Sequence, residues 1–208
     1  CVQRDPHDTL ARYIYGKDAQ FEPGAQWRYS NTNYTLLGMV IEAATEMPLT
    51  AAYRTRIYEP LGMASTFLDC YEEPLIDVVH GYTGSGDDMT DLTELHESIG
   101  WSAGGLVSTA ADLTTFARGL FGGALFDDPE SLVAMTTPAP GSSYGLGIAL
   151  QEGSMGHAGY VAGFRSLLTY APAFDTVVVM LYNHDGADPE ESLADMLDPV
   201  LPSLRSED

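Results

Sequence analysis

The hydrophobic pattern of this chain changes its period near Ser143, and this change restricts the fold more than any other feature. Before that point apolar residues recur at helical spacing, and after it they form short runs separated by turn residues. Helical segments followed by strands and one last helix predict an α+β fold with segregated layers. The pattern predicts two parts. Residues 1–142 form a mainly helical part with a loop excursion at 70–99, and residues 143–208 form an antiparallel meander with a C-terminal helix.

Local start and stop signals place the individual elements. Apolar residues at 34, 37, 41 and 44 predict a helix that Pro48 closes, and a second helix is expected at 50–59, ended by Pro60 and Gly62. Thr109 and Asp112 have the spacing of a helix cap, and Asp128 starts a short helix that runs to Met135. Three strands are expected at 144–150, 164–170 and 176–182, followed by a helix at 192–204.

The charge balance excludes some classes of partner. Acidic residues number 30 against 9 basic ones, which gives a net charge of −21, and Lys17 is the single lysine. Phosphate recognition needs clustered basic side chains, so nucleic acid and anionic membrane surfaces are not expected as partners. The sequence contains no apolar segment long enough to predict membrane insertion. We hypothesise that the acidic surface is adapted to high salt, which screens its self-repulsion.

The stretch 21–39 contains the most distinctive polar group of residues, the triplet Tyr29-Ser30-Asn31. Pro23-Gly24 breaks the chain before it, and the polar run from Ser30 offers helix caps before an apolar pattern begins. A phenol can relay a proton if a neighbouring cation lowers its pKa, and a carboxamide can both donate to and accept from a substrate amide. These two side chains could assist acyl transfer, but neither is its nucleophile.

The stretch resembles the second motif of the serine β-lactamase and penicillin-binding-protein superfamily, in its class C β-lactamase, D-alanyl-D-alanine carboxypeptidase and esterase branch. Two further segments agree in order and spacing: GWSAGGLVST at 100–109, and GHAGY at 156–160. The resemblance implies a β-lactamase-like fold, an antiparallel sheet with covering helices plus a helical subdomain. It also implies that an N-terminal part is missing, and gives a weak preference for an extracytoplasmic location.

The family's nucleophile motif is absent from these 208 residues. The mechanism needs Ser-x-x-Lys, which sets a serine hydroxyl beside an amine that takes its proton. Lys17 is preceded three residues earlier by Ile14. We therefore expect a fragment of an enzyme that acylates a serine with an ester, amide or lactam. The alternative is a non-catalytic module that binds a peptide or cell-wall fragment.

The resemblance assigns a role to each candidate site residue. Tyr29 would relay a proton and Asn31 would orient the substrate amide, whereas the competing interpretations are a buried aromatic residue and a helix cap; Ser30 is expected to be structural. His157 stands where the family has lysine or histidine, on the strand beside the substrate. The small Ala158 and Gly159 would allow close approach, and the backbone N–H of Tyr160 would contribute to the oxyanion hole. Histidine in place of a carboxylate-binding lysine favours an esterase, amidase or D-amino-acid peptidase over a penicillinase.

A lesser alternative is the nucleophile elbow of α/β-hydrolases, because residues 100–104 match G-x-S-x-G around Ser102, with Asp128 and His157 in the required order. The charged segment 92–99 does not fit the apolar strand that an elbow needs. The histidine and acidic spacings predict no metal, and no cofactor is expected. Cys1 and Cys70 could pair or remain isolated thiols.

Overall fold

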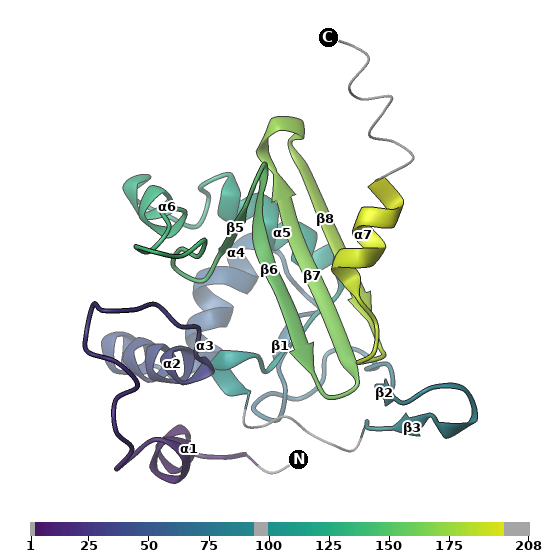
Figure 1. Cartoon of the computed structure of the whole chain (residues 1–208), viewed down its shortest axis with the longest axis horizontal. Coiled ribbons are helices and arrows are strands. Elements are labelled where there is room, and N and C mark those ends of the chain that lie inside the picture. The colour runs from purple at the N-terminus through teal and green to yellow at the C-terminus, as the bar shows by residue number, and fades with distance from the viewer. Residues whose placement is uncertain (1–2, 94–99, 198–208) are drawn as a thin grey trace.

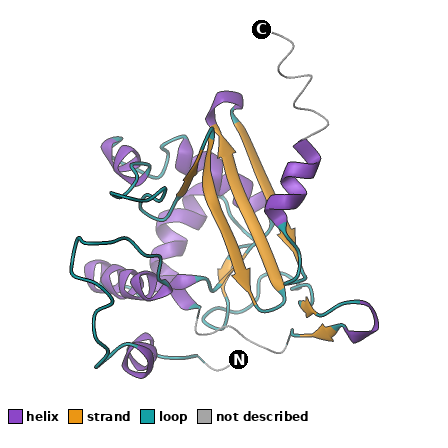
Figure 2. Ribbon diagram, in the orientation of Figure 1, coloured by secondary structure: helices purple, strands orange, loops and turns teal. Residues whose placement is uncertain are grey.

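A four-stranded antiparallel sheet lies at the centre of the molecule, with helices beside and behind it (Figure 1). This computed structural model describes residues 3–93 and 100–197. Along the chain, helices predominate before the long strands begin, and helix α7 (Pro189–Leu197) follows them. Figure 2 distinguishes the helices from the strands of the sheet by colour. The predicted α+β class, an antiparallel sheet with covering helices, is therefore confirmed.

The central sheet has the order β5-β6-β7-β8, and each strand pairs antiparallel with its neighbour in the chain. The sequence pattern predicted three strands and did not show β6 as a strand by its period. The prediction for 144–150 was also wrong at its start, because β5 begins only at Ala149, after a turn with Gly147 at a positive φ of 84°. The strands are β5 (Ala149–Gln151), β6 (Ser154–Val161), β7 (Phe164–Ala171) and β8 (Thr176–Tyr182).

The long helix after the Tyr-Ser-Asn triplet forms as its local signals predict. Helix α2 (Asn31–Thr45) is capped by Ser30, whose side chain accepts a hydrogen bond from the backbone N–H of Thr32, and it ends at Glu46 in the left-handed conformation. Helix α1 (Pro6–Tyr13) precedes it.

The second predicted helix is longer than expected and changes its winding. It consists of α3 (Leu49–Tyr53), a π-helical turn η1 (Arg54–Tyr58) and α4 (Glu59–Leu61). Pro60 does not end it, because it lies in the first turn of α4, where its missing N–H is tolerated. Gly62, in the left-handed conformation, ends the helix instead.

Helix α5 (Ala110–Phe121) packs against β7 and β8 behind the sheet (Figure 1). Thr109 caps it by accepting a hydrogen bond from the N–H of Asp112, as the sequence predicts. The ring of Phe121 stacks on that of Tyr170 from β7, with centroids 4.9 Å apart. Helix α5 thus packs on the sheet although it precedes residue 142. The predicted division into two parts at residue 142 remains a prediction. The other helices are α6 (Glu130–Met135) and α7 (Pro189–Leu197), the second of which lies beside β8.

The excursion at 70–99 lies in the chain between two short strands that pair with each other, β1 (Phe67–Leu68) and β4 (Leu106–Val107). Within it, β2 (Tyr82–Thr83) pairs with β3 (Thr90–Asp91), and the turn η2 (Gly86–Asp88) joins them. Cys70 is bonded in a disulfide and is not an isolated thiol, whereas Cys1 lies outside the described residues.

A small apolar cluster fixes the position of α2. Leu49, Leu68 and Trp101 are almost fully buried together. Trp101 belongs to the 3₁₀ turn η3 (Trp101–Ala103), which packs directly on α2. The core therefore determines where the helix that carries Asn31 lies.

Candidate active site

The Tyr-Ser-Asn triplet forms the N-terminus of α2. Ser30 has the structural role expected of it, because its side chain is the helix cap. Tyr29 and Asn31 lie one residue to either side of this cap, and both are exposed. The triplet therefore presents a phenol and a carboxamide at one helix end.

The ring of Tyr29 lies beside that of His157, with centroids 6.0 Å apart. The two residues come from different elements, the start of α2 and the middle of β6. The fold thus brings together two motifs that are far apart in the sequence. Their catalytic roles remain predictions.

Two tyrosines that the sequence did not single out complete an aromatic cluster at this place. The hydroxyl of Tyr34 lies 2.7 Å from that of Tyr144, and the Tyr144 hydroxyl lies 2.7 Å from Nε2 of His157. The Tyr29 ring contacts both tyrosine rings, at centroid distances of 5.6 and 5.7 Å. Tyr34 follows Asn31 by three residues, a spacing that places both on one side of α2 and could have suggested it; nothing local indicates Tyr144.

The pKa of Tyr29 is not lowered, as a proton relay would require. Its pKa is raised, first by partial burial and then by the neighbouring Tyr34. Among the described residues, no cation that lowers this pKa acts on Tyr29. A relay through Tyr29 would therefore need a positive charge from outside the described residues.

The edge of β6 beside this cluster has no strand partner over most of its length in the described structure. β5 pairs with β6 only from Ser154 to Gly156, whereas β7 pairs with it from Met155 to Val161 on the other side. Ala158 and Tyr160 are exposed there. The backbone groups of residues 157–161 that do not bond to β7 are thus available to a further extended segment, apart from the Ala158 carbonyl, which lies against Nδ1 of His157.

Gly159 has a second reason to be small besides substrate approach. A Cβ at this position would lie 2.2 Å from Oγ of Ser166 on β7. Tyr160 is 62% exposed, and its ring lies 4.0 Å from the guanidinium carbon of Arg165. The proposed contribution of the Tyr160 N–H to an oxyanion hole is not tested by these contacts.

Ser102 does not have the setting of a nucleophile elbow. It lies in the η3 turn, and its hydroxyl donates a hydrogen bond of 2.8 Å to the backbone carbonyl of Tyr34. The central sheet is antiparallel, whereas α/β-hydrolases have a mainly parallel one. The segment expected to carry the elbow's strand falls partly on 94–99, outside the described residues. Ser102 therefore has a structural function, joining the turn to α2.

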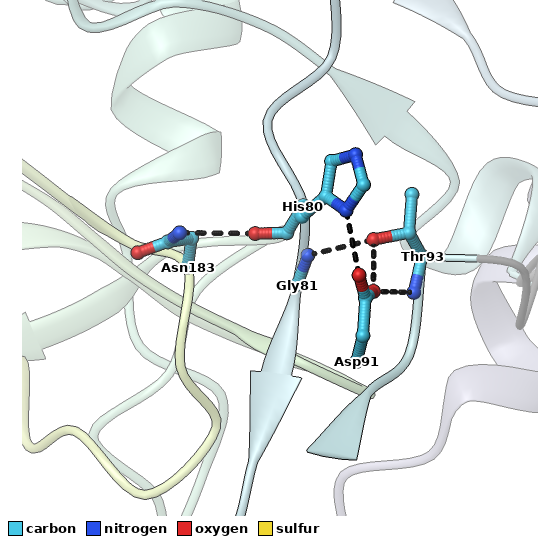
Figure 3. Close-up of polar contacts among 5 residues, drawn as sticks. All are labelled: His80, Gly81, Asp91, Thr93 and Asn183. Carbon is cyan, nitrogen blue, oxygen red and sulfur yellow. Dashed lines mark hydrogen bonds and ion pairs between the residues drawn. The ribbon is translucent and has the colours of Figure 1, made fainter. Parts of the chain in front are cut away.

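A second polar cluster lies at the open end of the β2–β3 hairpin, away from its turn η2 (Figure 3). Nδ1 of His80 lies 2.6 Å from Oδ2 of Asp91, and the other carboxylate oxygen accepts hydrogen bonds from the N–H and hydroxyl of Thr93. These hydrogen bonds, with that of Thr93 first, lower the pKa of Asp91 to about 2. The side chain of Asn183 donates to the carbonyl of His80 and so connects the hairpin to the chain after β8.

The described residues contain no group of three or more His, Cys, Asp or Glu side chains placed to hold a metal ion. Within the same part of the chain, no helix is long and apolar enough to cross a membrane.

Solved structures of other proteins share the overall fold of this chain. The structure of D-amino acid amidase from Ochrobactrum anthropi SV3 complexed with L-phenylalanine amide superposes with a TM-score of 0.80 at 28% identity, over 99% of this chain and 65% of that one. A D-stereospecific amidohydrolase from Streptomyces matches with a TM-score of 0.78 at 28% identity, over 92% of this chain and 60% of the other.

Sequence relatives point the same way. A D-aminopeptidase of Cereibacter sphaeroides is 26% identical over 86% of this chain, and the match covers 36% of that relative. This chain thus spans little more than a third of the relative's length. The family model described as Beta-lactamase matches residues 2–199, nearly the whole chain. The chain therefore belongs to the β-lactamase family, the superfamily of serine hydrolases that includes the penicillin-binding proteins.

Proposed function

We propose that this chain supplies the substrate-binding edge and the proton-relay tyrosine of a serine hydrolase that cleaves the amide bond of D-amino acid derivatives. The observation that carries the proposal is the contact of Tyr29 with His157 beside the unpaired edge of β6. The names of the relatives, a D-aminopeptidase and a D-amino acid amidase, support amides as the substrate class.

The reaction would follow the acyl-enzyme route. A serine from a segment outside these 208 residues attacks the substrate carbonyl, and the amine leaves with a proton that Tyr29 helps to transfer. Water then hydrolyses the ester and releases the acid. Asn31 would orient the substrate amide, and the Tyr160 N–H would stabilise the oxyanion.

The identity of residue 157 ranks the substrates within this class. A lysine carries a permanent charge that attracts a substrate carboxylate, whereas a histidine is at most partly charged at neutral pH. Amides and esters without a carboxylate at that position should therefore react better than penicillins or peptides with a free C-terminus. Esterase and lactamase activities remain alternatives with the same chemistry.

A second candidate is a binding module that has no catalysis of its own. The absence of Ser-x-x-Lys from these 208 residues is the observation that favours it. Such a module would use the same edge of β6 to bind a peptide or cell-wall fragment.

The test measures intact mass after treatment with a fluorophosphonate, and then hydrolysis. The 208-residue chain should keep its mass near 22.4 kDa without an adduct, whereas the longer protein should gain one adduct and hydrolyse D-amino acid amides faster than their L-enantiomers. A labelled serine within the 208 residues, with Ser102→Ala as the control, would contradict the proposal. A longer protein that binds these amides but neither labels nor hydrolyses them would establish the binding module.

A further inference from the structure

The side chain of Tyr144 lies between the two motifs of the candidate site and contacts both. Its hydroxyl is 2.7 Å from the Tyr34 hydroxyl on α2 and 2.7 Å from Nε2 of His157 on β6. The ring of Tyr144 meets that of His157 edge to face, with centroids 5.7 Å apart. Tyr144 therefore joins the helix to the edge strand through hydrogen bonds.

The second nitrogen of His157 determines how the protons are arranged. Nδ1 lies 2.5 Å from the backbone carbonyl oxygen of Ala158, and a carbonyl can only accept a hydrogen bond. Nδ1 must therefore carry a hydrogen. In the neutral imidazole, Nε2 is then the acceptor, so the Tyr144 hydroxyl donates to it.

The direction of the hydrogen bond between Tyr34 and Tyr144 follows from the number of hydrogens on the Tyr144 hydroxyl. A hydroxyl has one hydrogen, so Tyr144 must accept from Tyr34 once it donates to His157. Partial burial, followed by the Tyr34 hydrogen bond, raises the pKa of Tyr144 far above the ordinary range. Tyr144 hence stays protonated and can fill both roles.

We propose that Tyr144, supported by Tyr34, is a positioning residue that holds neutral His157 as its Nδ1–H tautomer with both ring nitrogens occupied. The imidazole ring then lies at the candidate site with no free N–H and no free nitrogen lone pair. The hydrogen-bond distances of Tyr144 and His157 carry this arrangement.

One consequence concerns specificity, and it rests on the proposed function. A histidine whose nitrogens are both engaged has no N–H to offer to a substrate carboxylate, so it favours substrates that carry a carboxamide or another neutral group at that position. Tyr144 would thus be a specificity-determining residue that acts through His157.

The test is the tautomer of His157, read from ¹⁵N chemical shifts of histidine-labelled protein above the pH at which its imidazole titrates. The wild type should show the Nδ1–H form. Tyr144→Phe removes the donor to Nε2 and should lower the ratio of Nδ1–H to Nε2–H by about two- to tenfold, the equivalent of one ordinary hydrogen bond. Tyr34→Phe should lower it less. Tyr182→Phe, a tyrosine on β8, is the matched control and should leave it unchanged.

An Nε2–H tautomer in the wild type, or an unchanged ratio in Tyr144→Phe, would overturn the inference. If Tyr144→Phe does not fold, Tyr34→Phe and the wild-type tautomer still decide. Failure of the proposed function would show separately, as a lack of amide hydrolysis by the longer protein with the His157 tautomer as expected. In an active enzyme, Tyr144→Phe should also reduce the preference in kcat/KM for carboxamide over carboxylate substrates.

Discussion

Replacement of Gly38 by alanine tests how closely α2 packs on the η3 turn. A Cβ at residue 38 would lie 2.3 Å from Oγ of Ser102, 2.6 Å from its Cβ and 2.8 Å from a ring carbon of Trp101. Carbon atoms in contact normally lie about 3.5–4.0 Å apart. The turn would thus have to move away from α2 by about 1 Å.

The turn has little freedom to move. Trp101 is only 5% exposed and packs with Leu49 and Leu68, so a shift disturbs the core cluster. Overpacking of this kind lowers stability by about 1–3 kcal/mol. Because three contacts fall below 3.0 Å, we take the upper half of that range; alanine in a helix regains about 1 kcal/mol over glycine. The net expected loss in the free energy of unfolding is about 1–2 kcal/mol.

Urea unfolding measures this loss as a lower transition midpoint at an unchanged slope. The matched second change is Ser102→Gly, which removes both side-chain atoms that the new methyl group meets. In the Gly38→Ala background it should restore part of the lost stability, because the approach of 2.8 Å to the Trp101 ring remains. In the wild type it should destabilise by removing the hydrogen bond to Tyr34. A Gly38→Ala protein as stable as the wild type, or no coupling between the two changes, would refute the packing argument.

Three further changes test other contacts. Asp112→Ala should lower the free energy of unfolding by about 2–3 kcal/mol in urea titrations, because its carboxylate accepts hydrogen bonds from the backbone N–H of residue 65 and from the buried hydroxyl of Thr66; Asp127→Ala, at an exposed position, is the control. Asp91→Asn should lower the melting temperature above pH 4 but not near pH 2, because a pKa held below its ordinary 3.8 gives stability that is lost as the pH falls through about 2; a difference that persists at pH 2 would contradict this. In a protein that contains this chain and has the proposed hydrolase activity, Tyr29→Phe should lower kcat about 10²-fold or more without changing the melting temperature, if Tyr29 relays the proton.

The elements that the sequence predicts well are those with local signals at both ends. Helix α2 has a serine cap, a helical apolar stripe and Pro48 after it, and it forms at the expected place. The second helix shows the limit of such rules. Pro60 is a stop signal in isolation, but a π-helical turn shifts the hydrogen bonding before it, and the helix continues to Gly62.

Strand β6 shows what the hydrophobic period misses. It contains Gly156, His157 and Gly159, which interrupt the apolar alternation, and it forms because β7 pairs with it from Met155 to Val161. Only the resemblance to a known family placed a strand here. The pairing is a long-range property that a window of a few residues does not contain.

The candidate site was predicted in part. Local reasoning grouped Tyr29 with Asn31, and the resemblance added His157. The sequence pattern shows Tyr34 only as one of the apolar residues at helical spacing and Tyr144 only as the start of a strand, because each has its partner far away in the chain. The hydrogen bonds that join them depend on how α2 and the sheet pack, which the sequence pattern does not specify.

The packing of α2 and the state of His157 should therefore be coupled. The hydroxyl of Ser102 binds the backbone carbonyl of Tyr34, whose own hydroxyl begins the chain of hydrogen bonds to His157. If Gly38→Ala displaces the turn, Tyr34 loses part of its support, and the Nδ1–H tautomer of His157 should become less populated, although His157 lies on another element. Ser102→Gly in the same background relieves the clash with Ser102 but does not restore the hydrogen bond to Tyr34. Stability should then recover in part while the tautomer ratio does not, and recovery of both would mean that α2 reaches His157 by another route.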